Sequence, residues 1–459
     1  MCRQVLILIV IVTCSSCVFI TYFAEMNIHN HFLSTLGFNE WTFVQRESFV
    51  QYPKQDELVL YAPTGSGKTL AYLIPLIDSL KGDTSGELKC IIFSPTRELA
   101  LQIEQVFKSL KSEIGITACY GGHPIKTEVK NLSAGPSVIV GTPGRIADHL
   151  HRGHIQMNTV THFIIDEFDK CLEIGFLKEM EEVYSRCSNL KKRIFCSATR
   201  IESFPDFVQL KKPVYIDALS DMDEPDITFY EVTDERNRPQ KMKQMIAGFR
   251  SEPTIIFCNF REDVDGLLTY FEGQDFAVTS YHGGLEQDER ERSLIKFRNG
   301  STPVLICTDL GARGLDIPKI KHIIHYQLPE KEDAFIHRNG RTARMSEDGS
   351  VYLFEEDREG ARYPLPECVG YKPKETAKYR SPEWTTIYFS AGKKDKINKI
   401  DLLGFICQKG GIGKQDVGMI AVLDRSSYVA LRSHQLQELL PELRKHKVKG
   451  QKLRISVSR

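Results

Sequence analysis

One short stretch of the sequence has the composition of a phosphate-binding loop. Its glycines would let backbone N–H groups approach phosphate oxygens, and the helix expected next would present its positively polarised N-terminus. We expect Lys68 to contact the β- and γ-phosphates of ATP and the Thr69 hydroxyl to bind Mg²⁺. The loop comprises Ala62, Pro63, Thr64, Gly65, Ser66, Gly67, Lys68 and Thr69. A glycine-rich turn can also serve only to pack a strand on a helix, but Gly-Lys-Thr between an apolar strand and a helix favours an ATP site.

A pair of carboxylates follows another apolar run further along the chain. Asp166 and Glu167 come at the end of the run Phe-Ile-Ile. A carboxylate there can hold the hydration shell of Mg²⁺, and its neighbour can orient and deprotonate the attacking water. Acid pairs are common on protein surfaces, but their place at the end of an apolar strand favours catalysis.

A run of spaced arginines, residues 337–344, could provide the cations that ATP hydrolysis needs. Negative charge develops on the transferring phosphoryl group, and an arginine delivered from another domain can stabilise it. In isolation such arginines would more often form a solvated face. Together with an ATP site earlier in the chain, they predict a catalytic site assembled between two lobes.

The chemistry must be positioned by alternating strands and helices. Apolar runs at 58–62, 90–94, 138–142, 163–166 and 194–198 are typical of buried parallel strands, and amphipathic segments such as 69–80 and 98–110 separate them. A polar connector near 217–226 interrupts this βαβ pattern, which restarts with 254–258, 304–308 and 322–326. We therefore expect two α/β domains, 26–216 and 217–357, followed by a linker, 358–383.

The remaining segment, 384–459, predicts a small α+β domain. Strands at 386–390, 418–424, 427–431 and 452–458 and helices at 395–408 and 434–444 give the βαββαβ order of an RRM-like sandwich. The whole chain has no net charge, but this segment carries 15 Lys and Arg against 6 Asp and Glu. Such asymmetry indicates a nucleic-acid surface, although a solvated basic face would have the same composition.

The cysteines and the N-terminal residues indicate the cellular compartment in which the protein is expected. The 12 cysteines are scattered, many of them inside apolar runs, and none has zinc-site spacing, so reduced thiols in a cytoplasmic protein are expected. Residues 5–23 are uncharged and long enough for a signal-peptide core or a marginal membrane span. Residues 1–25 are therefore either a hydrophobic leader that would bring a membrane contact, or an over-extended start ahead of Met26.

These features resemble those of one family, the DEAD-box RNA helicases, over nearly all of residues 26–354. Besides the phosphate loop and the acid pair, the motifs are Pro95–Ala100, Gly121-Gly122, Thr142–Arg145, Ser197–Thr199, His282–Gly284, Gln287 with Arg290, Thr308–Asp316 and His337–Arg344. The resemblance implies two tandem RecA-like doubly wound parallel-sheet domains. It also implies an RNA-stimulated ATPase with ATP and Mg²⁺ as cofactors. Nothing in the sequence indicates obligate oligomers, so a monomer is expected.

The resemblance also assigns roles to individual residues. Contacts to the RNA backbone are implied for Pro95, Thr96, Arg97, Gly121, Gly122, Thr142, Pro143, Gly144, Arg145, Gln287, Arg290, Thr308 and Asp309. Backbone contacts position a strand without selecting sequence, and contacts to 2′-hydroxyls favour RNA over DNA. Ser197 and Thr199 are implied to couple ATP state to domain closure, Asp316 and Gln45 to contact the nucleotide, and Arg341 and Arg344 to be arginine fingers.

Two positions depart from the family pattern. Phe168 stands in the signature tetrad 166–169 where alanine is usual, which leaves hydrolysis expected and unwinding efficiency open. Trp41 stands where proline is usual in the adenine-reading segment that contains Gln45, and Phe32 is a candidate for the upstream aromatic residue of that segment.

The C-terminal segment resembles the DbpA-type RNA-binding domain. The long RNP signature of ordinary RRM domains is absent, and Tyr388, Phe389 and Tyr428 are the candidates for base stacking. We instead expect binding by a basic face formed by Lys393, Lys394, Lys396 and Arg425. The resemblance suggests structured ribosomal RNA as the partner and ribosome assembly as the process. An ATP-gated RNA clamp with weak unwinding is the main alternative, and a DNA helicase a weaker one.

Overall fold

The computed structural model describes residues 30–63, 65–83, 85–122, 124–219, 226–233, 237–309, 320–342, 348–374 and 377–458. Two compact units, Met1–Asp223 and Glu224–Arg459, divide the chain. Residues 1–25 and most of the expected connector near 217–226 lie outside the described residues. Among the helices described, none is long and apolar enough to cross a membrane.

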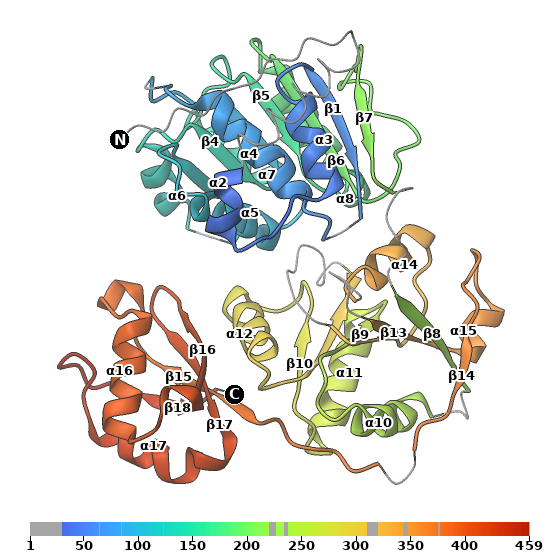
Figure 1. Ribbon diagram of the computed structural model, residues 1–459, viewed down its shortest axis with the longest axis vertical. Coiled ribbons are helices and arrows are strands. Elements are labelled where there is room, and N and C mark those ends of the chain that lie inside the picture. The colour runs from blue at the N-terminus through green and yellow to red at the C-terminus, as the bar shows by residue number, and fades with distance from the viewer. Residues whose placement is uncertain are drawn as a thin grey trace, which may run out of the picture. The chain divides into compact units, whose positions relative to one another are not determined.

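The first unit contains a parallel sheet of seven strands in the order β3-β4-β2-β5-β6-β1-β7 (Figure 1). The strands are β1 (Glu57–Tyr61), β2 (Cys90–Phe93), β3 (Ile116–Cys119), β4 (Val138–Gly141), β5 (His162–Ile165), β6 (Lys192–Ser197) and β7 (Val214–Asp217). The helices are α2 (Asn30–Leu36), α3 (Phe43–Gln51), α4 (Lys68–Leu80), α5 (Arg97–Ser109), α6 (Ile125–Leu132), α7 (Pro143–His151), α8 (Phe168–Ile174) and α9 (Leu177–Ser185).

Both faces of this sheet are buried. Leu58 and Leu60 of β1 pack into one core with α3, α4 and α5, whereas Val59 and Tyr61 pack into a second core with α7, α8 and α9. Alternate residues of one strand point to opposite faces, so burial of both sets requires helices on both sides. This is the doubly wound arrangement expected from the sequence.

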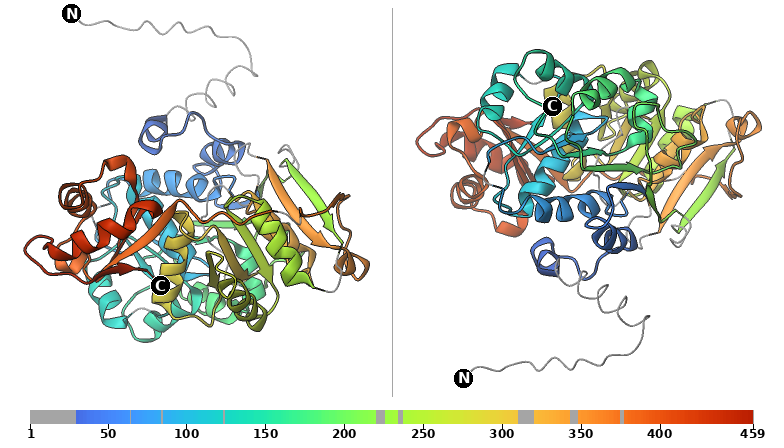
Figure 2. Two further views of the ribbon diagram at one scale, coloured as in Figure 1. Left: turned by 90° about the horizontal axis from the view of Figure 1, so that it is seen from below. Right: turned by 90° about the horizontal axis from the view of Figure 1, so that it is seen from above.

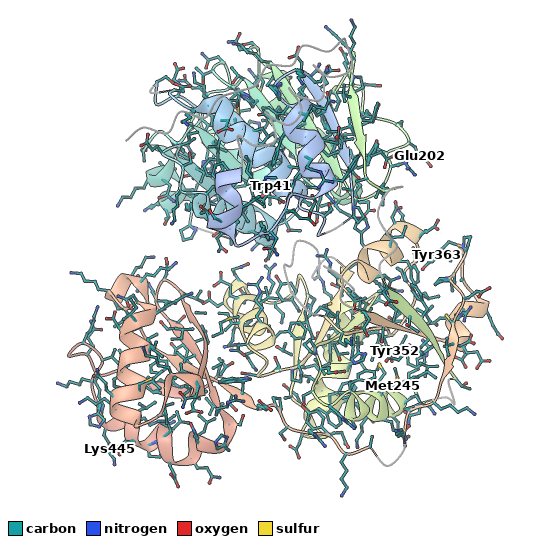
Figure 3. All side chains as sticks on the ribbon, in the orientation of Figure 1. Trp41, Glu202, Met245, Tyr352, Tyr363 and Lys445 are labelled. Atoms are coloured by element: carbon teal, nitrogen blue, oxygen red, sulfur yellow. The ribbon has the colours of Figure 1, made fainter. Side chains whose placement is uncertain are left out.

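The second unit begins with another parallel sheet, in the order β10-β11-β9-β12-β13-β8-β14. Its strands are β8 (Ile227–Val232), β9 (Thr254–Cys258), β10 (Val278–Tyr281), β11 (Val304–Thr308), β12 (His322–His325), β13 (Gly349–Phe354) and β14 (Val369–Tyr371). The helices are α10 (Arg238–Gly248), α11 (Arg261–Glu272), α12 (Gln287–Arg298), α14 (Glu332–Asn339) and α15 (Glu355–Glu359). Met245 and Tyr352, labelled in Figure 3, lie in the core between this sheet and α10 and α11.

The segment expected as a linker, 358–383, packs on this second α/β domain. It supplies the edge strand β14, which pairs with β8. The Tyr379 ring stacks on Phe276 with 4.0 Å between centroids, and its hydroxyl accepts a 2.9 Å hydrogen bond from the Ala277 amide. Tyr371 and Tyr379 thus attach this segment to the domain.

The C-terminal domain has the predicted βαββαβ order. It consists of β15 (Trp384–Phe389), α16 (Lys399–Gly410), β16 (Val417–Val422), β17 (Ser427–Arg432), α17 (Leu436–Lys445) and β18 (Ile455–Val457), with single 3-10 turns at Lys393–Asp395, Lys414–Asp416 and Ser433–Gln435. The antiparallel sheet has the order β16-β17-β15-β18, and α16 and α17 cover one of its faces (Figure 2). Together, the three sheets confirm two RecA-like domains followed by an RRM-like domain.

The first helix of this domain begins later than the sequence suggested. It was expected over 395–408, but α16 starts at Lys399. Lys396 has a left-handed φ of 59°, which interrupts a helix. Asn398 and Asp401 then form a capping box, in which Asn398 Oδ1 accepts from the Asp401 amide (3.0 Å) and Asp401 Oδ2 accepts from the Asn398 amide (2.9 Å).

The face of the C-terminal sheet opposite its helices is covered by the second α/β domain. The Thr386 hydroxyl on β15 accepts from Asn299 Nδ2 and donates to Ser301 Oγ, each at 2.8 Å. Thr386 and Ala430 are fully buried there, and Tyr428 is 6% exposed. The middle of this face is therefore buried within the second unit, whereas Trp384 and Tyr388 are half-buried.

Candidate active site

The predicted nucleotide-binding residues of the first unit meet at the carboxyl ends of three neighbouring strands. The phosphate loop follows β1, Asp166 follows β5, and Ser197 ends β6. Ligands of doubly wound sheets bind at this edge, because the strand-to-helix turns open there. Strand order thus gathers residues that lie far apart in sequence.

The phosphate loop has the backbone that its glycines require. Gly65 and Gly67 have φ values of 89° and 87°, in the left-handed region that favours glycine. Lys68 opens α4, and its buried ammonium group donates to the carbonyl oxygens of Ala62 and Pro63. Burial lowers the pKa of Lys68, while Asp166 acts to raise it. Thr64 lies outside the described residues.

Asp166 is the buried acid at the centre of the site. Its Oδ2 accepts a 2.9 Å hydrogen bond from the Tyr72 hydroxyl and lies 3.4 Å from Thr69 Oγ1. Burial, together with the neighbouring Glu167 charge, raises the pKa of Asp166 to about 6, although Lys68 opposes the shift. A cation near Oδ2 would favour the ionised form.

Glu167 occupies a conformation that non-glycine residues seldom adopt, with φ 48° and ψ 54°. Within the described residues its buried Oε2 has no hydrogen-bond partner. The Thr69 hydroxyl and the Asp166 and Glu167 carboxylates thus offer hard oxygen atoms, the ligands that Mg²⁺ prefers. These residues fit a magnesium ion.

A second segment, 41–45, is bonded to the phosphate loop. Gln45 Nε2 donates to the Gly67 carbonyl (3.2 Å), and the Thr42 hydroxyl donates to the Ser66 carbonyl (2.9 Å). A Cβ atom on Gly67 would lie only 2.2 Å from Gln45 Nε2, so the side chain needs the glycine. The segment expected to read adenine and the phosphate loop are therefore joined by hydrogen bonds.

The unusual aromatic residues of the first unit are buried. Trp41, labelled in Figure 3, packs edge-to-face on Phe49 with 5.3 Å between centroids, and Phe32 belongs to the same core. Phe168 is fully buried between Phe195 and Phe204, at centroid distances of 5.2 and 5.7 Å. Phe195 is two residues before Ser197, so Phe168 does pack beneath the Ser197–Thr199 segment.

The Ser197–Thr199 segment forms a small hydrogen-bonded turn. The Ser197 hydroxyl donates to the Thr199 carbonyl (2.6 Å) and accepts from the Thr199 amide (3.2 Å). The Ser197 carbonyl accepts from the Ala62 amide at 3.1 Å, which links this turn to the start of the phosphate loop.

The residues expected to contact RNA in the first unit lie at the same edge, but after the other strands. Pro95, Thr96 and Arg97 follow β2, Gly121 and Gly122 follow β3, and Thr142, Pro143, Gly144 and Arg145 follow β4. The Arg97 guanidinium lies over Gly122, where a Cβ atom would be 2.3 Å from Arg97 Nη1. The order β3-β4-β2-β5-β6-β1 therefore places the residues expected to contact RNA on one part of the edge and those expected to bind the nucleotide on another.

In the second unit, Arg338 is more enclosed than Arg341, the other arginine of the run that the structure describes. It is 1% exposed, with Nη2 donating to Asp309 Oδ2 (2.8 Å) and Asn259 Oδ1 (2.7 Å), and Nη1 donating to the Gln327 carbonyl (2.8 Å). Arg341 is 6% exposed. Arg344 and Asp316 lie outside the described residues.

The other residues expected to contact RNA in this unit sit at two strand ends. Gln287 opens α12 after β10, and Arg290 lies on its first turn. Thr308 ends β11 and Asp309 follows it. Because β10 and β11 are neighbours, these residues share one end of the sheet.

In the C-terminal domain the predicted basic residues lie on two paired loops. The Lys393 and Lys394 amides donate to the Leu423 and Asp424 carbonyls, each at 2.8 Å, which places Arg425 beside them. Lys393, Lys394, Lys396 and Arg425 are all exposed. The Lys394 ammonium also pairs with Asp424 at 2.7 Å. A basic surface of the expected composition is therefore present at this end of the domain.

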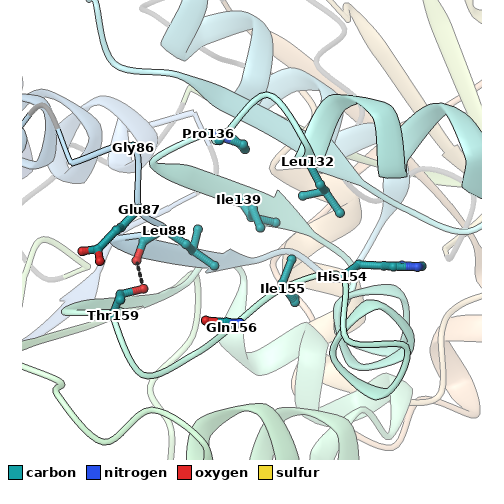
Figure 4. Close-up of a pocket in the computed structure, with 11 residues that line it drawn as sticks. Gly86, Glu87, Leu88, Leu132, Pro136, Ile139, His154, Ile155, Gln156 and Thr159 are labelled. Carbon is teal, nitrogen blue, oxygen red and sulfur yellow. Dashed lines mark hydrogen bonds between the residues drawn. The ribbon is translucent and has the colours of Figure 1, made fainter.

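A pocket of about 260 Å³ in the first unit lies away from these residues (Figure 4). It is lined by loops at the amino ends of β2, β4 and β5, including Leu88, Pro136 and Thr159. The Thr159 hydroxyl donates to the Leu88 carbonyl across it at 2.9 Å. The opposite edge of the sheet carries the predicted chemistry.

Three important contacts were not anticipated from the sequence. Tyr72 reaches Asp166, Arg338 links Asp309 to Asn259, and the buried Glu128 of α6 bonds to Arg145. Tyr72 could have been found, since it lies three residues after Thr69 and thus on the same helical face. Arg338 and Glu128 have no such local signal.

Comparison with known proteins matches three domain models to this chain. A DEAD/DEAH box helicase model covers residues 42–207, a helicase conserved C-terminal domain model covers 237–346, and a DbpA RNA-binding domain model covers 386–457. The DEAD-box ATP-dependent RNA helicase CshA of Bacillus cereus is 32% identical over 352 residues, which are 74% of this chain and 67% of CshA. The chain belongs to the DEAD-box RNA helicases.

Other relatives extend this DEAD-box match. The ATP-dependent RNA helicase DbpA of Bacillus subtilis is 27% identical over 461 residues, 92% of this chain and 96% of its own. The chain spans only 53% of DEAD-box ATP-dependent RNA helicase 9 of Oryza sativa, at 33% identity over 337 residues. DEAD-box membership confirms the predicted RNA-stimulated ATPase and helicase class, with ATP and RNA as ligands.

Solved DEAD-box structures share the fold. Mss116p bound to single-stranded RNA and AMP-PNP superposes with a TM-score of 0.64 and 25% identity, covering 75% of this chain and 77% of Mss116p. Saccharomyces cerevisiae Dbp5 bound to RNA and ADP-BeF3 gives a TM-score of 0.62 at 23% identity, covering 72% and 86%. The DEAD-box chain therefore has the predicted two-domain α/β architecture.

Proposed function

We propose that this chain couples Mg-ATP hydrolysis to local unwinding or remodelling of structured ribosomal RNA during ribosome assembly. One observation carries the proposal: a DEAD-box motor is joined in one chain to a DbpA-type RNA-binding domain. A motor without sequence preference needs a separate domain to choose its substrate. We further propose a cytoplasmic monomer with domains at 26–216, 217–357 and 384–459.

Each residue of the nucleotide site has a proposed task. Backbone amides at the glycines of the phosphate loop and the Lys68 ammonium hold the phosphates, and Gln45 contacts the adenine. Thr69 and Asp166 hold the magnesium ion, which, when bound, neutralises charge that builds on the phosphate oxygens. Glu167 orients the attacking water and accepts its proton. The unpartnered Oε2 of Glu167 supports that last role.

The second domain completes this proposed mechanism. Arg341 and Arg344 stabilise charge on the transferring phosphoryl group, and Asp316 contacts the nucleotide. Ser197 and Thr199 couple ATP binding to domain closure. The hydrogen bond from the Ala62 amide to the Ser197 carbonyl supports this coupling, because it joins the turn to the phosphate loop.

RNA is gripped through its sugar–phosphate backbone. We assign this role to the residues that follow β2, β3 and β4 in the first domain, and to Gln287, Arg290, Thr308 and Asp309 in the second. Bending of one bound strand would unstack a short duplex, and phosphate release would then free it. Contacts of this kind carry no sequence information, and contacts to 2′-hydroxyls would select RNA over DNA.

The C-terminal domain is proposed to bind a structured RNA through Lys393, Lys394, Lys396 and Arg425. Base stacking on Phe389 and Tyr428 is not favoured, because Phe389 lies in the core with the helices and Tyr428 is buried. The two paired loops leave the basic side chains exposed instead. Cations of this kind contribute salt-dependent affinity for phosphates.

An ATP-gated RNA clamp is the second candidate, and Phe168 favours it. Its ring packs with those of Phe195 and Phe204 beneath the Ser197–Thr199 turn. A rigid turn would allow hydrolysis while weakening its link to strand separation. Duplex release with little ATP turnover per strand would exclude a clamp, whereas ATP-dependent binding without release would support it.

The first experiment compares ATP hydrolysis by the full chain with ribosomal RNA, an unrelated RNA and DNA at one salt concentration. We expect the strongest stimulation by ribosomal RNA, and loss of that preference when Lys393, Lys394, Lys396 and Arg425 are changed together to Gln. Equal stimulation by both RNAs would retain the helicase and remove the targeting role. Equal stimulation by DNA would contradict RNA selectivity.

A further inference from the structure

One buried carboxylate in the first unit contacts two of the segments that we assign to RNA binding. Glu128 of α6 is fully buried. Its Oε2 accepts from Arg145 Nε and from the His149 ring nitrogen Nε2, each at 2.7 Å. Its Oε1 accepts from the Tyr120 amide at 3.1 Å. Tyr120 directly precedes Gly121 and Gly122.

These bonds hold the Glu128 carboxylate in its charged form. Burial acts to raise the pKa of Glu128, but hydrogen bonds from His149, Arg145 and Tyr120 outweigh it and keep the pKa below its ordinary value. Hydrogen bonds between charged partners are among the strongest in proteins, and removing one partner leaves the other buried without compensation. The arrangement is therefore expected to be rigid.

The same network reaches the third RNA segment. The Arg97 guanidinium lies over Gly122, and the turn that contains Gly122 begins at the Tyr120 amide held by Glu128. The hydrogen bond from Arg145 Nε to Glu128 fixes the plane of the Arg145 guanidinium group. Three strand ends, those of β2, β3 and β4, thus depend on the position of one side chain.

A metal site is the competing explanation for this cluster. Cys119, Glu128 and His149 offer ligand atoms within 4.8 Å of one another. However, both Glu128 oxygens already accept hydrogen bonds, and the Arg145 guanidinium occupies the position beside Oε2. A cation there would face an existing positive charge, so the geometry favours a hydrogen-bonded hub.

We propose that Glu128 is a positioning residue for RNA binding, which holds Arg145 and the Gly121–Gly122 turn in the arrangement that grips the RNA backbone. This inference rests on the proposed RNA contacts of those residues. Glu128 itself touches no RNA in this scheme and acts through Arg145 and the Gly121–Gly122 turn. Its influence should therefore appear in RNA affinity and not in ATP chemistry.

The test is the variant Glu128→Gln in the full chain, assayed for ATP hydrolysis as RNA is titrated. Glutamine has nearly the same shape but offers Arg145 one fewer acceptor and no charge. We expect the KM for RNA to rise roughly tenfold. kcat at saturating RNA and the KM for ATP should stay within about twofold, because the residues expected to bind the nucleotide are untouched.

Glu104→Gln is the matched control. Glu104 lies on α5. Its Oε1 accepts from the Ala118 amide of β3, the strand that precedes Tyr120, at 3.1 Å and pairs with Lys108 at 2.9 Å. It contacts none of the proposed RNA segments among its described partners. This variant changes an α5 carboxylate that bonds to β3 but not to the proposed RNA segments, so the KM for RNA should not change.

Arg145→Ala, alone and combined with Glu128→Gln, distinguishes a failure of the Glu128 inference from a failure of the proposed RNA role of Arg145. If Glu128 acts through Arg145, the double variant will resemble Arg145→Ala alone. A raised KM in Arg145→Ala with no change in Glu128→Gln would overturn the inference and leave the proposed function standing. No change in either variant would contradict the RNA role of Arg145 itself.

A folding defect is addressed by a second substitution. Glu128→Asp keeps the charge but shortens the side chain, so it cannot reach all three donors. Should Glu128→Gln not fold, Glu128→Asp is expected to raise the KM for RNA by a smaller factor with an unchanged kcat. An unchanged KM for RNA in a folded Glu128→Asp protein would then overturn the inference.

Discussion

The Tyr72 hydroxyl donates a 2.9 Å hydrogen bond to Asp166 Oδ2, inside the buried part of the nucleotide site. Tyr72 is on the second turn of α4, after the phosphate loop, whereas Asp166 follows β5. The bond fixes the carboxylate oxygen that lies 3.4 Å from the Thr69 hydroxyl. Helix α4 therefore provides both Thr69 and the tyrosine that holds Asp166 beside it.

Tyr72→Phe should therefore weaken magnesium use without abolishing hydrolysis. Loss of a hydrogen bond to a charged group costs about 1.5–3 kcal/mol, so the Mg²⁺ concentration for half-maximal ATPase activity should rise about tenfold or more. A magnesium titration at fixed ATP measures this. Tyr61→Phe is the control, since the Tyr61 hydroxyl accepts a long hydrogen bond of 3.4 Å from the Ile201 amide.

Asp166→Asn should abolish ATP turnover yet stabilise the magnesium-free protein at neutral pH. The folded-state pKa of Asp166 is raised from 3.8 to about 6, so the folded chain retains a proton that the unfolded chain has lost. Stability from this group is present below the unfolded pKa and disappears as pH rises through the folded pKa. Asparagine cannot ionise, so the variant avoids a loss of up to about 3 kcal/mol in the free energy of unfolding.

Urea unfolding in EDTA across the pH range measures that difference. The stability gap between Asp166→Asn and the unsubstituted protein should be largest above pH 6 and shrink as the pH falls towards 3.8. A gap independent of pH would contradict the buried, proton-binding state of Asp166.

Phe168→Ala should lower stability and reveal whether the aromatic cluster restrains unwinding. Removing a fully buried phenylalanine typically costs about 3–5 kcal/mol, through lost burial and the cavity left behind. Thermal unfolding measures the loss. We expect ATPase activity to persist and duplex release per ATP to increase. Unchanged duplex release would remove the structural support for the clamp.

Phe204→Ala serves as a comparison for that variant. Phe204 stacks on Phe168 and contacts Phe195, so the variant loosens the same cluster while the tetrad keeps its phenylalanine. An increase of unwinding in both variants would assign the effect to packing beneath the turn.

Thr386→Val should loosen the C-terminal domain from the second α/β domain. The variant leaves Asn299 and Ser301 without their buried hydroxyl partner, which costs about 1–3 kcal/mol. Calorimetry should show the C-terminal domain unfolding at a lower temperature, separately from its neighbour. Thr385→Val is the control, because the Thr385 hydroxyl bonds to Ser433 inside the C-terminal domain itself.

Local patterns in the sequence determined much of this protein. Apolar runs predicted β1, β2, β4, β5 and β6 to within two residues at each end, and Gly-Lys-Thr placed the start of α4. The strand β3 was missed, because its sequence Ile-Thr-Ala-Cys is short and only moderately apolar. Such signals are local: a buried strand needs consecutive apolar residues, and a phosphate loop needs glycines at fixed spacing.

Only the tertiary structure decided which distant residues meet. The apolar pattern of a strand indicates that it is buried but not which strand lies beside it. The order β3-β4-β2-β5-β6-β1 was therefore needed to see that the residues expected to contact RNA are separated from those expected to bind the nucleotide. The contacts of Glu128 with Arg145 and of Thr386 with Asn299 join side chains whose types alone suggest solvent exposure. Their burial is stable because each polar group finds a partner, a condition set by packing and not by sequence spacing.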